Sequence, residues 1–156
     1  MTNPQEKIFF HARYMNRADL KQILAIEEDS FDYPWDQDDF LVAIQDSNIS
    51  CHVLELNEKI IAYYTYSLQK TKIEITNIAV DRPYRRKGVA RQIVENITDR
   101  LDLFDLKYVS ITVAEHNLQA QLFFKKCGFK YIKTLKDYYE DYVGDAYLMS
   151  YRKPKE

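Results

Sequence analysis

Hydrophobic and polar residues recur with two different periods along this chain, and the two periods predict its secondary structure. After Gly88 the apolar residues recur at three- and four-residue steps, which predicts one long amphipathic helix; they are Ala90, Ile93, Val94, Ile97, Leu101 and Phe104. Elsewhere, short runs rich in β-branched and aromatic residues predict strands. These strands are residues 7–14, 50–56, 59–68, 72–80, 107–114, 129–135 and 146–151.

Residues that cap helices locate the other three helices. Asn16, followed three residues later by Asp19, predicts a capping box at the start of a helix that runs to about Asp29. A second short helix is expected over residues 36–46, and a last one over residues 117–127. Gly88 aside, the remaining glycine of note is Gly128, which is placed to end that last helix. Strands interspersed with helices predict a mixed α/β sheet covered on both faces.

The composition favours one folded domain and argues against several classes of function. The 156 residues are 46% apolar and 29% charged, as in an average globular domain, so we expect a single domain over residues 1–156. The net charge of −2 gives no indication of nucleic-acid or membrane binding, and the oligomeric state is not indicated. No apolar run reaches the ~18 residues of a membrane span, and no signal peptide is recognisable. Two cysteines without a disulfide or metal pattern predict a cytoplasmic protein that binds no metal.

The most informative segment is Arg85-Arg86-Lys87-Gly88-Val89-Ala90, between a strand and the long helix. Main-chain amides at the start of a helix have no partner within the helix, and the helix dipole adds positive charge there. A glycine lets the backbone approach a phosphate closely, so the segment suits a pyrophosphate. It matches neither the P-loop nor the three-glycine dinucleotide motif. An ordinary basic surface patch, formed by Arg85, Arg86, Lys87 and Arg91, is the alternative.

Several motifs together resemble the GNAT superfamily of N-acetyltransferases. They are Arg85-x-x-Gly88-x-Ala90, the preceding Asn77-Ile78-Ala79-Val80, Asn117, and Lys126-Cys127-Gly128-Phe129. Pro34-Trp35 and residues 145–149 extend the match to this superfamily. Residues 145–149, with Tyr138-Tyr139 before them, are similar to the RimI-like and other protein N-terminal acetyltransferases. The resemblance covers nearly the whole chain. It implies a GNAT-like, mixed but mostly antiparallel central sheet of about seven strands, flanked by four helices.

The resemblance also implies how acetyl-CoA, the co-substrate, is held. Main-chain groups of Ile78, Ala79 and Val80 would pair with the pantetheine arm as an added strand would. Amides of residues 86–91 would hold the pyrophosphate, and Asn117 would contact the arm, although capping a helix also explains Asn117 fully. The implied cofactor-binding residues are Ile78, Ala79, Val80, Arg85, Arg86, Lys87, Gly88, Val89, Ala90, Arg91, Asn117 and Phe124.

The catalytic residues are less clearly indicated. The RimI-like enzymes carry a Glu where this chain has Thr112, and a proton-donating Tyr where it has Phe124. Glu74 lies in a strand between isoleucines, and burial there would raise its pKa toward that of a useful base; a solvated carboxylate is the alternative. Tyr138 and Tyr139 are the candidate acids or acceptor contacts, unless they only pack.

These substitutions favour an α-amine as the acceptor. Near pH 7.4, deprotonating an α-amine of pKa ~7.7–8.0 costs roughly 1 kcal/mol or less, whereas a lysine of pKa ~10.4 costs about 4 kcal/mol. We therefore expect acetyl transfer to a protein N-terminus, by direct attack within a ternary complex. A small amine such as a polyamine, amino acid or aminoglycoside is the alternative acceptor. A non-catalytic acetyl-CoA-binding module is the third hypothesis.

Overall fold

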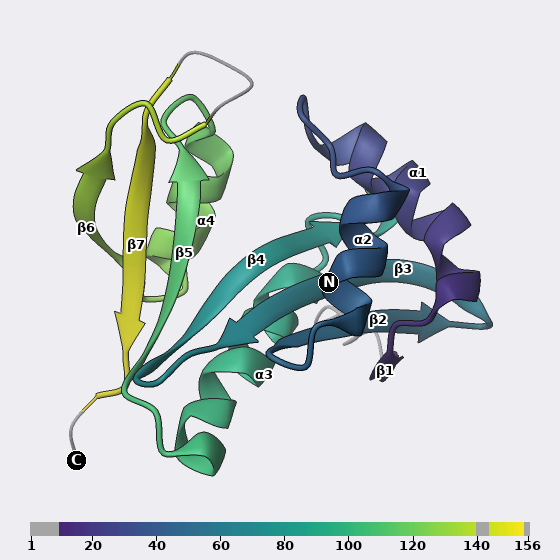
Figure 1. Cartoon of the computed structure of the whole chain (residues 1–156), viewed down its shortest axis with the longest axis horizontal. Coiled ribbons are helices and arrows are strands. Elements are labelled where there is room, and N and C mark those ends of the chain that lie inside the picture. The colour runs from purple at the N-terminus through teal and green to yellow at the C-terminus, as the bar shows by residue number, and fades with distance from the viewer. Residues whose placement is uncertain (1–9, 140–143, 155–156) are drawn as a thin grey trace, which may run out of the picture. The chain divides into compact units, whose positions relative to one another are not determined.

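The computed structural model describes residues 10–139 and 144–154, which form four α-helices and seven strands. Figure 1 shows their arrangement. The strands are β1 (His11–Tyr14), β2 (Ile49–Leu56), β3 (Lys59–Leu68), β4 (Lys72–Val80), β5 (Tyr108–Ala114), β6 (Lys130–Leu135) and β7 (Ala146–Arg152). The helices are α1 (Leu20–Ser30), α2 (Gln37–Gln45), α3 (Val89–Phe104) and α4 (Leu118–Lys126), with 3₁₀ turns η1 (Arg17–Asp19) and η2 (Arg82–Tyr84).

The seven strands follow the order β1-β2-β3-β4-β5-β7-β6. The pair β4 and β5 is parallel, whereas β1 with β2, β5 with β7 and β6 with β7 are antiparallel. This sheet, with its four helices, confirms the predicted fold class. A register shift between Tyr131 and Lys133 interrupts the pairing of β6 with β7.

The chain divides into two compact units. The first contains the described residues up to Tyr66 together with Asn77–Ile93; the second contains Ser67–Thr76 and the described residues from Val94 onward. Both β4 and α3 therefore contribute residues to each unit. The expectation of a single domain over residues 1–156 stays a prediction.

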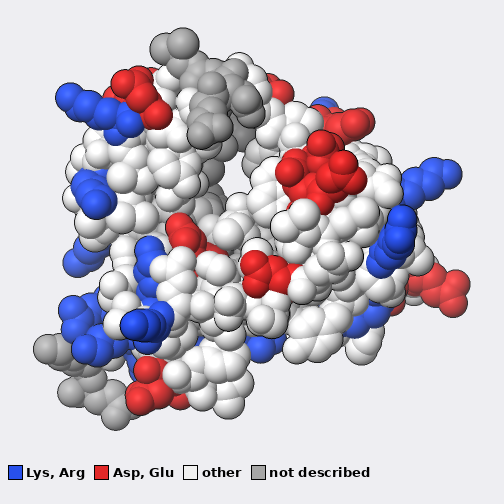
Figure 2. All heavy atoms as spheres, viewed as in Figure 1, with Lys and Arg blue, Asp and Glu red and all other residues white. Residues whose placement is uncertain are grey.

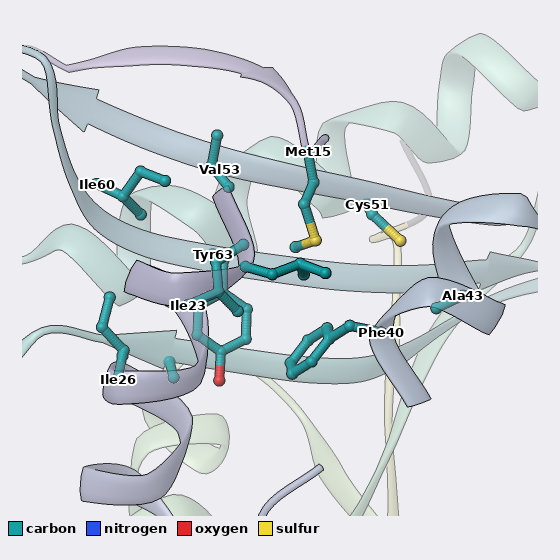
Figure 3. Packing of buried hydrophobic residues seen from close by; sticks show 11 residues of the cluster. Met15, Ile23, Ile26, Phe40, Ala43, Cys51, Val53, Ile60 and Tyr63 are labelled. Atoms are coloured by element: carbon teal, nitrogen blue, oxygen red, sulfur yellow. The ribbon is translucent and has the colours of Figure 1, made fainter. Parts of the chain in front are cut away.

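The core of the first unit lies where α1 and α2 cover β2 and β3 (Figure 1). Phe40 of α2 and Tyr63 of β3 meet edge to face, with 5.7 Å between their ring centroids. Ile23 points toward the same rings from α1 (Figure 3). Each of these three side chains is fully buried, so the two helices are fixed to the sheet by apolar packing.

Local signals placed most element boundaries to within a residue or two. Asn16 and Asp19 form the expected capping box, but they open the η1 turn, after which α1 continues to Ser30. The hairpin between β2 and β3 turns through Asn57 and Glu58, both with positive φ. The first predicted strand, residues 7–14, is seen as His11–Tyr14, and its earlier part lies outside the described residues.

No described helix has the length and apolar character needed to cross a membrane. Within the described residues, no group of three or more His, Cys, Asp or Glu side chains is arranged to hold a metal ion.

Candidate functional site

The loop that joins β4 to α3 has the geometry of an anion-binding turn. Arg86 and Gly88 have positive φ values of 62° and 81°, and α3 begins at the next residue, Val89. The Gln92 amide donates to the Gly88 carbonyl oxygen, so the amides of the residues just before Gln92 have no acceptor within the helix. A Cβ added to Gly88 would have no atom within 4 Å, so the face of the loop at Gly88 is open. The loop therefore presents main-chain donors at a positive helix end.

The four cations of this segment do two different things. Arg86, Lys87 and Arg91 are exposed. Arg85 is half-buried, and its Nε donates to the Val80 carbonyl oxygen at 2.8 Å while its Nη2 donates to Ser30 Oγ at 2.9 Å. Arg85 thus fastens the loop to the end of β4 and to the last residue of α1. These contacts occupy part of the Arg85 guanidinium. The expected role of Arg85 in binding an anion stays a prediction.

Replacing Arg85 with lysine is expected to lower the free energy of unfolding by about 1–3 kcal/mol, because one ammonium cannot replace two divergent charge-assisted hydrogen bonds. Urea unfolding at neutral pH measures this change. Arg86→Lys is the matched control, because the Arg86 side chain is exposed. Equal unfolding midpoints for the two variants would show that the Arg85 contacts contribute nothing.

Buried and less buried residues alternate along strand β4. Ile73, Ile75, Asn77 and Ala79 are buried, whereas Glu74, Thr76 and Ile78 lie on the less buried face. The register with the parallel strand β5 runs from Lys72 opposite Tyr108 to Ile75 opposite Ile111. The last part of β4, residues 77–80, belongs to the first unit.

A buried carboxylate lies beside this part of β4, within the first unit. Glu27 of α1 is 1% exposed, and its Oε1 accepts hydrogen bonds from the Trp35 amide at 3.1 Å and from Asn77 Nδ2 at 3.3 Å. The Tyr63 hydroxyl donates to Oε2. Burial, with a smaller contribution from the charge of Asp39, raises the pKa of Glu27 to about 7, against the lowering effect of the hydrogen bonds from Trp35 and Asn77. Glu27 thus connects α1, the α1–α2 loop, β3 and β4.

Sequence reasoning missed this cluster. A signal was present, because Glu27 lies four residues after Ile23 and seven after Leu20, on the buried face of α1. Asn77 was noted only as part of a motif, although it is a buried polar residue in a strand. A polar residue at such a position requires a partner, and here the partners come from distant segments.

The proposed catalytic residues all belong to the second unit. Glu74 is half-buried, between the two alternatives of a buried and a solvated carboxylate, and accepts a hydrogen bond from Gln69 Nε2 at 2.7 Å. Tyr138 is exposed, and its ring meets that of Tyr139 edge to face at 5.0 Å. The roles of all three residues stay predictions.

The remaining predicted contacts lie on α4 and β5. Asn117 caps α4, because its Oδ1 accepts from the Ala120 amide at 3.1 Å. Phe124 is buried against Phe129, with 5.2 Å between ring centroids, so little of its side chain is available to a ligand. Thr112 pairs with Leu148 of β7. The contact of Asn117 and Phe124 with a cofactor stays a prediction.

Known proteins resemble this chain in sequence and in fold. Residues 20–129 match the model of the Acetyltransferase (GNAT) family. The N-alpha-acetyltransferase of Sulfolobus acidocaldarius is 26% identical, over 94% of each chain.

Two solved structures share the fold. The ribosomal-protein-S18-alanine N-acetyltransferase from Escherichia coli has a TM-score of 0.82 at 23% identity, covering 95% of this chain and 96% of that one. Arabidopsis thaliana Naa50, in complex with the bisubstrate analogue CoA-Ac-MVNAL, has a TM-score of 0.77 at 19% identity, covering 92% and 98%.

Proposed function

We propose, from the premise that this chain belongs to the Acetyltransferase (GNAT) family, that it transfers the acetyl group of acetyl-CoA to the α-amine of a protein N-terminus. The observation that carries the proposal is the loop of residues 85–88, whose positive-φ glycine immediately precedes α3, after the η2 turn that follows β4. The relative from S. acidocaldarius, an N-alpha-acetyltransferase, supports an α-amine as acceptor. The CoA-peptide analogue bound to Naa50 supports acetyl-CoA as donor.

The chain's own residues would hold the donor in two places. Main-chain amides of residues 86–91 would bind the pyrophosphate, supported by the open face at Gly88 and the exposed Arg86 and Lys87. Main-chain groups of residues 78–80, at the end of β4, would pair with the pantetheine arm as an added strand would. Acetyl-CoA would supply the thioester whose C–S bond breaks as the new C–N bond forms.

Proton transfer would depend on weaker catalysts than in the RimI-like enzymes. The amine nitrogen loses a proton, which Glu74 would take directly or through water, and the departing sulfur gains one, for which Tyr138 and Tyr139 are the candidates. Thr112 and Phe124 cannot replace the Glu and Tyr of the related enzymes. Burial raises the pKa of the Cys51 thiol to about 11, which disfavours it as an acetyl carrier and favours direct attack by the amine.

The proposal is tested by incubating the protein with acetyl-CoA and short peptides that differ in the first residue. Each peptide also contains an internal lysine, whose side-chain amine competes with the α-amine. Mass spectrometry should locate the acetyl group on the α-amine. Modification of lysines alone would contradict the proposed acceptor. Spermidine and free amino acids serve as competing acceptors, and thiol release with these alone would favour a small-molecule enzyme. Coenzyme A binding with no thiol release for any amine would indicate a binding module.

Replacing Glu74 with glutamine is expected to lower kcat at least about tenfold, because the amide cannot accept the proton. The loss should be largest at low pH, where less of the peptide amine is already neutral. Glu28→Gln, the same change at an exposed position of α1, is the control. An unchanged pH–rate profile for the Glu74 variant would exclude Glu74 as the base.

A further inference from the structure

The second unit has an open apolar groove between α4 and the strands β6 and β7. Its volume is about 640 Å³. Three of its side chains are well exposed, Leu118 at 61%, Leu122 at 50% and Tyr131 at 57%. Its apolar lining consists of Leu118, Leu122, Phe129, Tyr131, Tyr147 and Met149. Exposed apolar side chains gathered in one groove are typical of a surface that binds another macromolecule.

The segment of α4 and β6 that borders this groove is basic, although the acidic residues Asp137 and Asp145 lie next to the ends of β6 and β7. Residues 118–136 contain five lysines and no Asp or Glu, a net charge of +5 in a chain whose total is −2, so the other residues carry −7. Lys125 and Lys130 line the groove itself. The basic side chains over β6 are visible in Figure 2. All five lysines are exposed, and none forms an ion pair with another residue of the described ranges 10–139 and 144–154.

We propose that this groove, formed by α4, β6 and β7, binds an acidic amphipathic helix of a partner protein. The apolar floor would receive the apolar stripe of such a helix, while the lysines at the rim would attract acidic residues on its flanks. The proposal goes beyond acetyl transfer and does not depend on it.

The chemistry of the lining favours a protein helix over RNA. Of the three well-exposed apolar side chains, Leu118 and Leu122 are aliphatic, which leaves the ring of Tyr131 as the one among them on which a base could stack. The lysines of β6 have a second possible role, because lysines on an edge strand prevent unwanted strand pairing. That role does not account for Lys125, which lies on α4 and lines the same groove.

The test uses the full chain without acetyl-CoA and two fluorescent helical peptides of about 18 residues. Both carry the same leucine stripe; one has Glu at every flanking position and the other has Lys. The Glu peptide should bind at least about tenfold more tightly than the Lys peptide, and its affinity should fall as the salt rises to about 0.5 M. Equal binding of the two peptides, or binding of neither, would overturn the proposal.

Variants of the groove separate the two contributions. Leu122→Ser should weaken binding of the Glu peptide at least about tenfold. Leu103→Ser, at an exposed leucine of α3, should leave this binding unchanged. The double variant Lys125→Glu and Lys130→Glu should reverse the preference, so that the Lys peptide binds better, whereas Lys107→Glu should not reverse it. If the double lysine variant does not reverse the preference, the proposal is contradicted. This test does not depend on Leu122→Ser, whose weaker binding could also result from poor folding.

Two further measurements test whether RNA or a second copy of this chain occupies the groove instead. A single-stranded RNA that competes with the Glu peptide, and whose binding is unaffected by Leu122→Ser, would favour a nucleic acid and overturn the proposal. Self-association in analytical ultracentrifugation, abolished by Leu122→Ser, would show that a second copy of the chain covers the groove and would also overturn it.

Discussion

Replacing Gly88 with valine is expected to weaken coenzyme A binding at least about thirtyfold, equivalent to about 2 kcal/mol. Two effects act together. A β-branched residue at a φ of 81° is strained, at a cost of roughly 1–2 kcal/mol. Its side chain would also occupy the open face of the loop, where the pyrophosphate is proposed to lie. Isothermal titration calorimetry with coenzyme A measures the change.

Gly88→Asn separates strain from obstruction. Asparagine tolerates a positive φ far better than valine, yet it also places a Cβ on the open face of the loop. We expect this variant to keep the melting temperature of the original protein and still to bind coenzyme A at least about tenfold more weakly. If both variants bind coenzyme A normally, the pyrophosphate does not lie at this loop, and the central support for the proposed function is lost.

The second large effect concerns the buried carboxyl of Glu27. Its pKa is about 7 in the folded protein, compared with an ordinary value of 4.5. Between these two pH values the folded protein retains a proton that the unfolded chain has released. The resulting stabilisation is complete below about pH 4.5 and is lost as the pH rises to about 7. It amounts to about 3 kcal/mol at most.

Glu27→Gln should remove this dependence, because glutamine stays neutral at every pH. The unfolding free energies of the original protein and the variant should therefore diverge by about 2–3 kcal/mol between pH 5 and pH 8, with the variant gaining relative to the original protein. Asp19, whose pKa is lowered mainly by its hydrogen bonds from Arg13, has the opposite pH dependence, but it is present in both proteins and cancels in the difference.

The measurement is urea unfolding at a series of pH values, followed by the fluorescence of the single tryptophan. That residue, Trp35, donates its amide to Glu27 and so reports on the same region. Glu28→Gln is the control, because Glu28 is exposed on the same helix. Parallel stability curves for the original protein and the Glu27 variant would show that Glu27 does not hold a proton near neutral pH.

Much of the fold was readable because its signals are local. The apolar period of three and four residues predicted α3 from Val89 to Phe104, and the observed bounds agree. The turn at Asn57-Glu58 and the cap at Asn117 each depend on residues only a few positions apart. The loop before α3 was predicted for the same reason, since the positive φ of Gly88 and the following helix are both properties of one short segment.

What the sequence alone determined is therefore the set of elements, their caps and turns, and the loop with a positive-φ glycine that precedes α3. The tertiary structure decided which polar groups meet across the fold. Glu27 and Asn77 are 50 residues apart, and Arg85 reaches Ser30 across 55. The basic groove likewise exists only because α4 lies beside β6 and β7. Local patterns specify a backbone conformation through short-range sterics and hydrogen bonds, whereas the burial that raises the pKa of Glu27, and the partners of its carboxylate, arise only when distant segments pack together.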